Sequence, residues 1–256
     1  MKIAILTNDS LPAKYFVGKL LQMNNETIDI YIEKKIKKKN HISLFTSVKK
    51  ELKKYKRFFM KQYSLSDIEM LMERRARKRY FPDFKKVIQS VKMPKNPVDI
   101  HSKEFLNKIE ASSYDIIILF GTSIVGQSLI SLPKVGMLNI HSSLLPYYKG
   151  TMPEFWQLYF QDYAYCGVTI HYVENSVDTG NILLQKSIQV EDKDTFYDLR
   201  YKNILAAIEL IPDAIKLAKE GNKGKVQESV TQEVFRFSMI TDEKKKVLYR
   251  RLGWSV

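Results

Sequence analysis

The sequence predicts an open α/β fold in which a mostly parallel, Rossmann-like sheet carries helices on both faces. Short, nearly continuous apolar runs, such as residues 2–7 and 114–120, are typical of strands buried on both faces of a parallel sheet. Segments with strand character alternate along the chain with segments of helical periodicity. Polar residues follow several of the strands, and open α/β sheets bind their ligands at such positions.

The predicted elements alternate through most of the chain. Strands are expected at residues 2–7, 27–32, 114–120, 137–141, 168–173 and 182–187. Helices are expected at residues 12–23, 103–111, 124–131, 152–162 and 194–219. This order predicts a parallel sheet that is covered by helices on both faces.

Turn and capping residues separate these elements. Asn8, Asp9 and Ser10 follow the first strand and supply turn and cap chemistry. Pro12 suits the first turn of a helix, where its missing N–H has no intrahelical partner. Gly136 turns the chain into the strand expected at residues 137–141.

The chain divides into one large domain and a small extension. We expect residues 1–220 to form the α/β domain, interrupted by a basic helical insertion at about residues 34–86. Residues 221–256 are expected to form a C-terminal extension, with a hairpin at residues 225–237 and a helix at residues 242–252. The extension is too short to be a domain of its own.

Composition excludes several classes of protein. The 256 residues are 45% hydrophobic and 27% charged, which is typical of a globular protein rather than a disordered one. No apolar run approaches the roughly 18–20 residues that span a bilayer, and no secretory signal is recognisable. The single cysteine, Cys166, excludes an internal disulfide. We therefore expect a cytoplasmic protein.

The net charge of +14 is concentrated in one segment. Residues 34–86 contain 19 Lys and Arg against 5 Asp and Glu, whereas the rest of the chain has 23 of each. Apolar residues recur there at spacings of three and four, which predicts amphipathic helices with a basic face. Such a surface attracts phosphates or anionic lipid headgroups, or it simply keeps the protein in solution.

Two familiar phosphate-binding motifs are absent from the chain. No Gly-x-Gly-x-x-Gly follows a predicted strand, and no Gly-x-x-x-x-Gly-Lys-Ser/Thr occurs. A simple NAD-binding or ATP-binding function is therefore disfavoured.

The residues that carry chemistry begin at the end of the strand expected at 137–141. Asn139 and His141 are two positions apart, so they face the same side of a strand and present an amide and an imidazole together. Downstream, the strand at 168–173 leads into a polar loop that ends in Asp178, Thr179 and Gly180. An amide, an imidazole and a carboxylate are thus available to one site.

Four linked motifs resemble those of the folate-dependent formyltransferase family, in the family's order and at about its spacing. These motifs are Asn139-Ile140-His141, Ser143-Leu144-Leu145-Pro146, Gly167-Val168-Thr169 and Asp178-Thr179-Gly180. The resemblance covers roughly residues 114–217, with residues 2–7 fitting as the first strand. Residues 34–86 do not resemble the family's core pattern.

The resemblance implies 10-formyltetrahydrofolate as formyl donor and Asn139, His141 and Asp178 as the catalytic residues. It also implies that the pterin packs between a strand exit and a second loop. The residues implied there are Thr122, Ser123, Ile124 and Val125 at the exit, with Val173, Asn175 and Ser176 in the loop. Asn8, Asp9, Ser10 and Lys149 are then expected to contact the acceptor substrate.

These residue types suit the chemistry that the resemblance implies. An amine that attacks a formyl carbon puts negative charge on the formyl oxygen, and the Asn139 amide and a protonated His141 would donate to that oxygen. Asp178 would favour the charged imidazole and relay the proton of the amine. No metal ligands stand at helical spacing, so a metal is not expected. His171 is expected to be a packed or supporting residue.

The acceptor amine remains open at this point. Residues 150–156 look closer to sugar N-formyltransferases, which favours a nucleotide-linked amino sugar of surface polysaccharide biosynthesis, a phosphate-bearing acceptor. Family members that act on methionyl-tRNA carry a C-terminal β-barrel, whereas about 35 residues follow Gly221 here. Glycinamide ribonucleotide is a third acceptor. A protein of another class, which binds RNA or an anionic membrane without catalysis, is the remaining alternative.

Overall fold

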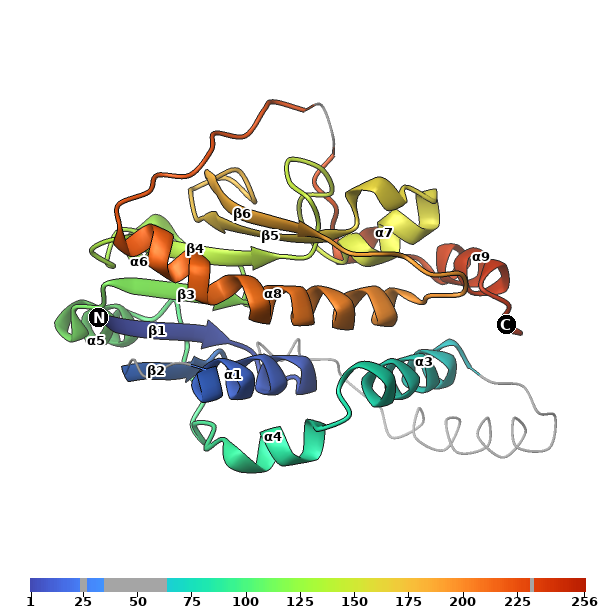
Figure 1. Ribbon diagram of the computed structural model, residues 1–256, viewed down its shortest axis with the longest axis horizontal. Helices are drawn as coiled ribbons and strands as arrows, with labels where there is room; N and C mark the ends of the chain where they lie inside the picture. Colours follow the sequence, from blue (N-terminus) through green and yellow to red (C-terminus); the bar gives the residue numbers. More distant parts are fainter. Residues whose placement is uncertain (24–26, 35–63, 231–232) are drawn as a thin grey trace, which may run out of the picture.

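The computed structural model of the protein describes residues 1–23, 27–34, 64–230 and 233–256. The lysine-rich clusters at residues 35–39 and 53–57, and the apolar residues predicted to accompany them at 44–59, lie outside the described residues. The described chain forms a central sheet with helices on either side of it (Figure 1).

The sheet has six strands in the order β2-β1-β3-β4-β5-β6. The strands are β1 (Lys2–Thr7), β2 (Thr27–Ile32), β3 (Ile116–Phe120), β4 (Gly136–His141), β5 (Gly167–Tyr172) and β6 (Ile182–Ser187). The pairs β1–β2, β1–β3 and β3–β4 are parallel. The open, mostly parallel α/β sheet predicted from the sequence is therefore confirmed.

One strand, β5, runs against the others, which the alternating pattern did not predict. β5 is antiparallel to β4 and to β6. A loop without a helix joins β5 to β6, and a short connection of this kind suits antiparallel neighbours, whereas parallel neighbours need a longer crossover. The reversal places the loop that contains Asp178 beside β4.

Helices cover both faces of the sheet, as predicted. The helices are α1 (Leu11–Met23), α3 (Leu65–Tyr80), α4 (Phe84–Ser90), α5 (Lys103–Ser112), α6 (Gln127–Ile130), α7 (Pro153–Phe160), α8 (Phe196–Lys219) and α9 (Asp242–Arg251), with single 3₁₀ turns at Tyr163–Tyr165 and Phe237–Met239. α1, α3, α4 and α8 bury apolar side chains against one face. α5 and α6 pack on the other face.

A third apolar cluster joins α3, α7, the start of α8 and α9. Trp156 of α7 is its largest member and is 1% exposed. Phe235 stacks on the Trp156 ring at 4.9 Å, and Tyr249 of α9 is also fully buried here. The cluster attaches the C-terminal helix to the α/β domain through burial of large aromatic surfaces.

The hairpin predicted at residues 225–237 is wrong for the residues that the structure describes in this range. Lys225 pairs with Ile182 next to the exposed edge of β6, and Phe235 pairs with Gly150. An edge strand presents unpaired backbone groups, so the tail binds the domain instead of folding on itself. The helix predicted at residues 242–252 is present as α9.

The described part of the basic segment is helical, as predicted. Ile68, Met72 and Ala76, spaced by four residues on α3, are buried, while Met70 is 63% exposed and lies outside this apolar stripe. Ser64 and Asp67 form a capping box that begins the helix. Among the described helices, none is long and apolar enough to cross a bilayer.

Candidate active site

β4 and β5 together position three of the side chains at the candidate site. Asn139 and His141 lie two residues apart near the end of β4 and face the same side of the sheet. His171 of β5 is directly opposite Asn139 in the antiparallel register. Opposed residues share a face of the sheet, so the three side chains converge because of strand pairing alone.

Asp178 completes the cluster from the loop between β5 and β6. Its backbone has φ of 52°, a left-handed conformation that Asp tolerates better than most residues. Two residues later, a Cβ at Gly180 would lie 1.9 Å from the Tyr172 carbonyl oxygen, so only glycine fits there. Gln227 of the tail donates to the Asp178 and Gly180 carbonyl oxygens at 3.0 and 2.7 Å. These contacts hold the loop against β4.

The Asp178 carboxylate contacts every other polar group of the cluster. Oδ2 accepts a hydrogen bond of 2.7 Å from the Gly150 N–H and lies 3.4 Å from His141 Nδ1. Oδ1 accepts from Asn139 Nδ2 at 3.3 Å and lies 3.6 Å from His171 Nε2. The sequence-based expectation that Asn139, His141 and Asp178 share one site is thus matched by their positions.

The hydrogen-bond partners fix the protons of the two imidazoles. His141 Nε2 is 2.9 Å from the Tyr148 carbonyl oxygen, and His171 Nδ1 is 2.7 Å from the Tyr172 carbonyl oxygen. A carbonyl oxygen only accepts, so each of these nitrogens donates. His171 Nε2 is then free to accept from Asn139 Nδ2 at 3.1 Å. Both N–H groups of the Asn139 amide are therefore directed at acceptors within the site.

The environment keeps Asp178 ionised. Burial raises the pKa of its carboxyl, but the neighbouring imidazoles of His141 and His171 and the hydrogen bond from the Gly150 N–H outweigh burial and lower that pKa well below its usual range. His141 and Asp178 are almost completely buried, with side chains 6% and 10% exposed. The site thus combines a fixed negative charge with two imidazoles and little water.

Two of the residues implied for the formyl donor, Val125 and Val173, lie on the Asn139 side of the sheet. Val125 is buried in the apolar cluster on this face, and Val173 packs against the same cluster. Thr122 is half-buried, and Ile124 is 71% exposed, which is unusual for a large apolar side chain. Asn175 and Ser176 are exposed in the loop that leads to Asp178.

Ser123 is already engaged by other side chains. Its backbone N–H donates to Glu33 Oε2 at 2.9 Å, and its hydroxyl donates to the same carboxylate. His101 Nε2 lies 3.1 Å from the Ser123 hydroxyl. These contacts tie the exit of β3 to the end of β2, so the Ser123 side chain shapes the loop.

A cavity of about 520 Å³ opens on the opposite face of the same strand ends. Asn8 and Ser10 line it, together with Ile140 and Ser142, the residues that alternate with Asn139 and His141 along the chain. The other two residues expected to bind the acceptor, Asp9 and Lys149, do not line the cavity. Asp9 pairs with Lys14 at 2.6 Å, and the Lys149 carbonyl accepts from the Phe235 N–H.

Three charged residues that the sequence did not single out also line this cavity. Arg200 of α8 lies 3.4 Å from the buried carboxylate of Glu154, and Glu73 accepts hydrogen bonds from Arg77 and Tyr201. Among the described residues that line the cavity, Arg200 is the only cation. Arg200 and Glu154 are 46 positions apart in the sequence, so only the packing of α7 against α8 brings them together.

Metal ligation has no support in the described residues, among which no group of three or more His, Cys, Asp and Glu could hold an ion. The single cysteine, Cys166, is buried, and burial raises the pKa of its thiol to about 12. It therefore has no thiolate character at neutral pH.

Comparison with known protein families gives one clear match. The model of the family described as Formyl transferase matches residues 33–215, a range that includes the basic segment. The methionyl-tRNA formyltransferase of Clostridioides difficile strain 630 is 32% identical over 128 residues, 49% of this chain and 41% of that protein. The methionyl-tRNA formyltransferase of Staphylococcus aureus strain JH1 is 30% identical over 178 residues, 68% and 56% of the two chains. The chain thus spans about half the length of these curated relatives.

Solved structures share the fold at low sequence identity. A sugar N-formyltransferase from Shewanella sp. FDAARGOS_354 superposes with a TM-score of 0.62 and 16% identity, over 98% of this chain and 87% of that one. The formyltransferase PseJ from Anoxybacillus kamchatkensis, in complex with UDP-4,6-dideoxy-4-formamido-L-AltNAc and tetrahydrofolate, gives a TM-score of 0.54 at 18% identity, over 97% and 90%. These likenesses extend over nearly the whole chain, including the C-terminal extension.

Proposed function

The chain belongs to the formyl transferase family, and from this premise we propose that it transfers a formyl group from 10-formyltetrahydrofolate to the primary amine of a nucleotide-linked amino sugar. The observation that carries the proposal is the meeting of Asn139, His141 and Asp178 at the end of β4, within 3.4 Å of one another through Asp178. The cluster lies at the end of β4, where Ile140 and Ser142 of the acceptor cavity alternate along the chain with Asn139 and His141.

The donor would lie on the Asn139 face. Ile124, exposed in the segment that follows β3, offers an apolar surface that a planar ring would cover, and backbone groups of the loop before Asp178 are available to read its edge. These residues fit a folate. The donor supplies an electrophilic formyl carbon when bound.

Asp178 and His141 would handle the protons. Asp178 stays ionised at neutral pH and so accepts the proton that the attacking amine loses, directly or through a water molecule. His141, whose Nε2 donates to Tyr148, faces Asp178 through Nδ1 and would donate from there to the formyl oxygen as it gains charge. Asn139 would exchange one of its two internal hydrogen bonds for one to that oxygen.

The cavity on the opposite face suits the sugar part of the acceptor. Its lining is about half apolar, and its polar side chains are mostly neutral groups and carboxylates, which bind hydroxyl groups and an amine. Arg200 is the one cation among the described residues that line it and would bind a phosphate. The named sugar N-formyltransferases share this fold over nearly their whole length, which is a further support.

We expect formyl transfer to a nucleotide-linked amino sugar and none to the same sugar whose amine is already acylated. The measurement is release of tetrahydrofolate together with the mass of the product, using a panel of nucleotide-linked amino sugars, glycinamide ribonucleotide and charged initiator methionyl-tRNA. Formate with ATP in place of the folate should give no product. Donor turnover with water alone would identify a hydrolase and contradict the proposal.

Methionyl-tRNA is the second candidate acceptor, because the curated relatives at 30–32% identity carry that activity in their names and residues 34–86 have a local charge excess. Phosphate contacts make such binding fall steeply with salt. Formylation of methionyl-tRNA in the panel, at a rate above that of every sugar nucleotide, would select this candidate.

His171 would position Asn139, since its Nε2 accepts an Asn139 N–H. We expect His171→Ala to lower kcat about tenfold, the order of one lost hydrogen bond to a neutral group, with KM for both substrates little changed. His171→Gln restores an acceptor on a longer arm and should recover part of the loss. Steady-state kinetics of both variants test this, with circular dichroism to verify folding. Equal kcat for the alanine and glutamine variants would leave His171 a merely structural residue.

A further inference from the structure

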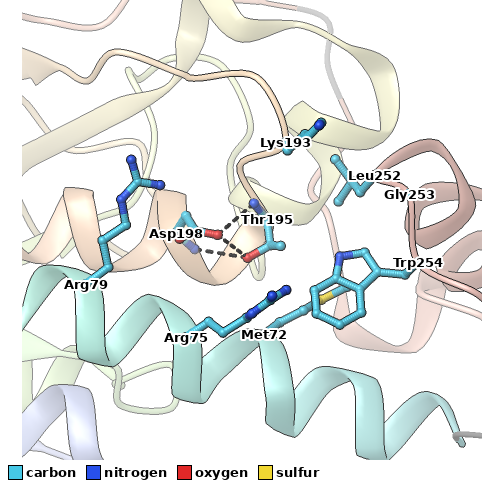
Figure 2. Close-up of a pocket in the computed structure, with 9 residues that line it drawn as sticks. All are labelled: Met72, Arg75, Arg79, Lys193, Thr195, Asp198, Leu252, Gly253 and Trp254. Carbon is cyan, nitrogen blue, oxygen red and sulfur yellow. Dashed lines mark hydrogen bonds between the residues drawn. The ribbon is translucent and has the colours of Figure 1, made fainter.

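A second cavity, of about 480 Å³, lies between α3, the start of α8 and the C-terminal segment (Figure 2). No lining residue is common to this cavity and the proposed acceptor cavity. α3 contributes Glu73 to the acceptor cavity but Arg75 and Arg79 to the second one, so the two cavities open on different sides of this helix. The proposed formyl transfer does not use this region.

Positive charge gathers on the wall of the second cavity. Arg75 and Arg79 are four residues apart, so they occupy the same side of α3, and Lys193 approaches from the turn before α8. Arg79 is paired with Glu191 at 2.6 Å. Among the described residues, no carboxylate lies within ion-pair distance of Arg75 or Lys193.

Among the described residues that line the cavity, the one carboxylate, Asp198, caps α8. Asp198 Oδ2 accepts hydrogen bonds from the backbone N–H and the hydroxyl of Thr195, at 2.8 and 2.5 Å, in the capping box that begins α8. Figure 2 shows these bonds on the cavity wall. The charge of Asp198 is therefore partly offset by the helix cap. Among the described residues, the cations Arg75 and Lys193 remain without a carboxylate partner.

The other wall is aromatic and apolar. Trp254 is half-buried, and its backbone N–H donates to the Tyr249 carbonyl oxygen at 2.9 Å, which fixes the residue to the end of α9. The Arg75 guanidinium lies 5.3 Å from the centre of the Trp254 ring, a cation–π contact. Met72 and Leu252 extend the apolar surface. An indole face beside unpaired cations recognises a planar aromatic group that carries phosphate.

We infer that this cavity is a second binding site, for a nucleotide whose base packs on Trp254 and whose phosphates bind Arg75 and Lys193. The volume is within the range of small-ligand pockets and suits one nucleotide. A free nucleoside diphosphate and a nucleotide within single-stranded RNA share this chemistry, so both are tested below.

The test is calorimetric titration of the whole protein with UDP, UMP, uridine and inorganic phosphate at low ionic strength. We expect saturable binding of UDP that is tighter than that of UMP and at least tenfold tighter than that of uridine or phosphate alone. Tryptophan fluorescence measures the same binding. A base stacked on the Trp254 ring should quench the emission of Trp254, whereas Trp156 is buried and should not respond.

Variants assign the binding to this cavity. Arg75→Gln and Lys193→Gln should each weaken UDP binding at least tenfold, whereas Lys95→Gln, which removes the same charge from an exposed lysine elsewhere, should not. Trp254→Leu should weaken binding, and Trp254→Phe should keep binding but lose the fluorescence change. The rate of formyl transfer by Arg75→Gln should remain within about twofold of that of the parent protein. Absence of UDP binding in this cavity would therefore overturn the inference without contradicting the proposed function.

Three results would overturn the inference. The first is no saturable UDP binding to the parent protein. The second is binding that Ser10→Ala in the acceptor cavity abolishes and Arg75→Gln leaves unchanged. The third is phosphate alone binding as tightly as UDP, which would make the cavity a plain anion site. A short single-stranded RNA that binds more tightly than UDP, with the same sensitivity to Arg75→Gln, would identify RNA as the source of the nucleotide.

Discussion

Replacing Asp178 with asparagine is expected to lower kcat for formyl transfer about 10²–10⁴-fold, the range for loss of a general base. Asparagine keeps the shape of the side chain but removes the charge that faces His141 and the group that would accept the proton of the amine. Steady-state rates of tetrahydrofolate release measure the change. Asp213→Asn, which removes an exposed carboxylate from α8, is the matched control and should retain full activity.

The effect of Asp178→Asn on stability should also depend on pH. The pKa of Asp178 is lower in the folded protein than its value of about 3.9 in an unfolded chain. Its charged form therefore stabilises the fold above about pH 4, and this contribution disappears as the pH falls through the folded-state pKa. Thermal unfolding should show the largest difference between parent and variant near neutral pH, and a smaller one in acid. A variant with normal kcat would remove Asp178 from the reaction.

Replacing Gly150 with alanine is expected to destabilise the protein and to lower kcat, although no reacting side chain is changed. Gly150 has φ of 100°, a conformation that costs other residues about 1–3 kcal/mol. An added Cβ would also lie 2.1 Å from the Phe235 carbonyl oxygen. Relief of this clash must move the Gly150 N–H, which donates to Asp178. Urea unfolding and kcat measure the two effects.

Gly126→Ala is the control for this substitution. Gly126 has φ of −89°, and nothing lies within 4 Å of an added Cβ there. Its free energy of unfolding should change by less than about 1 kcal/mol, with unchanged kcat. Normal stability and activity of Gly150→Ala would show that the backbone near Phe235 adapts freely and that Asp178 does not depend on Gly150.

The strands were predictable because their burial leaves a strong pattern. Residues 2–7, 27–32 and 182–187 form β1, β2 and β6 with the expected bounds. Strand direction leaves a weaker trace, since the sequence of β5 is compatible with either orientation. We expected β5 to be parallel to its neighbours, so the pairing of His171 with Asn139 was not predicted. That pairing follows only from the antiparallel register.

The two sides of the candidate site also differed in how far the sequence could predict their residues. Asn139, His141 and Asp178 could be found because short motifs with fixed spacing carry them. Arg200 and Glu154 have no such motif, and they meet only because two helices pack together. The C-terminal tail binds an existing strand edge rather than folding locally, and weak alternation in the sequence does not reveal such a partner.

The alternation of side chains at the end of β4 has an evolutionary consequence under the proposed function. Ile140 and Ser142 belong to the acceptor cavity, while Asn139 and His141 alternate with them and turn to the other face. Mutations can therefore remodel the recognition of one reactant without disturbing the other. Under the proposed function, a lineage that retains its one-carbon donor is free to recruit new amines.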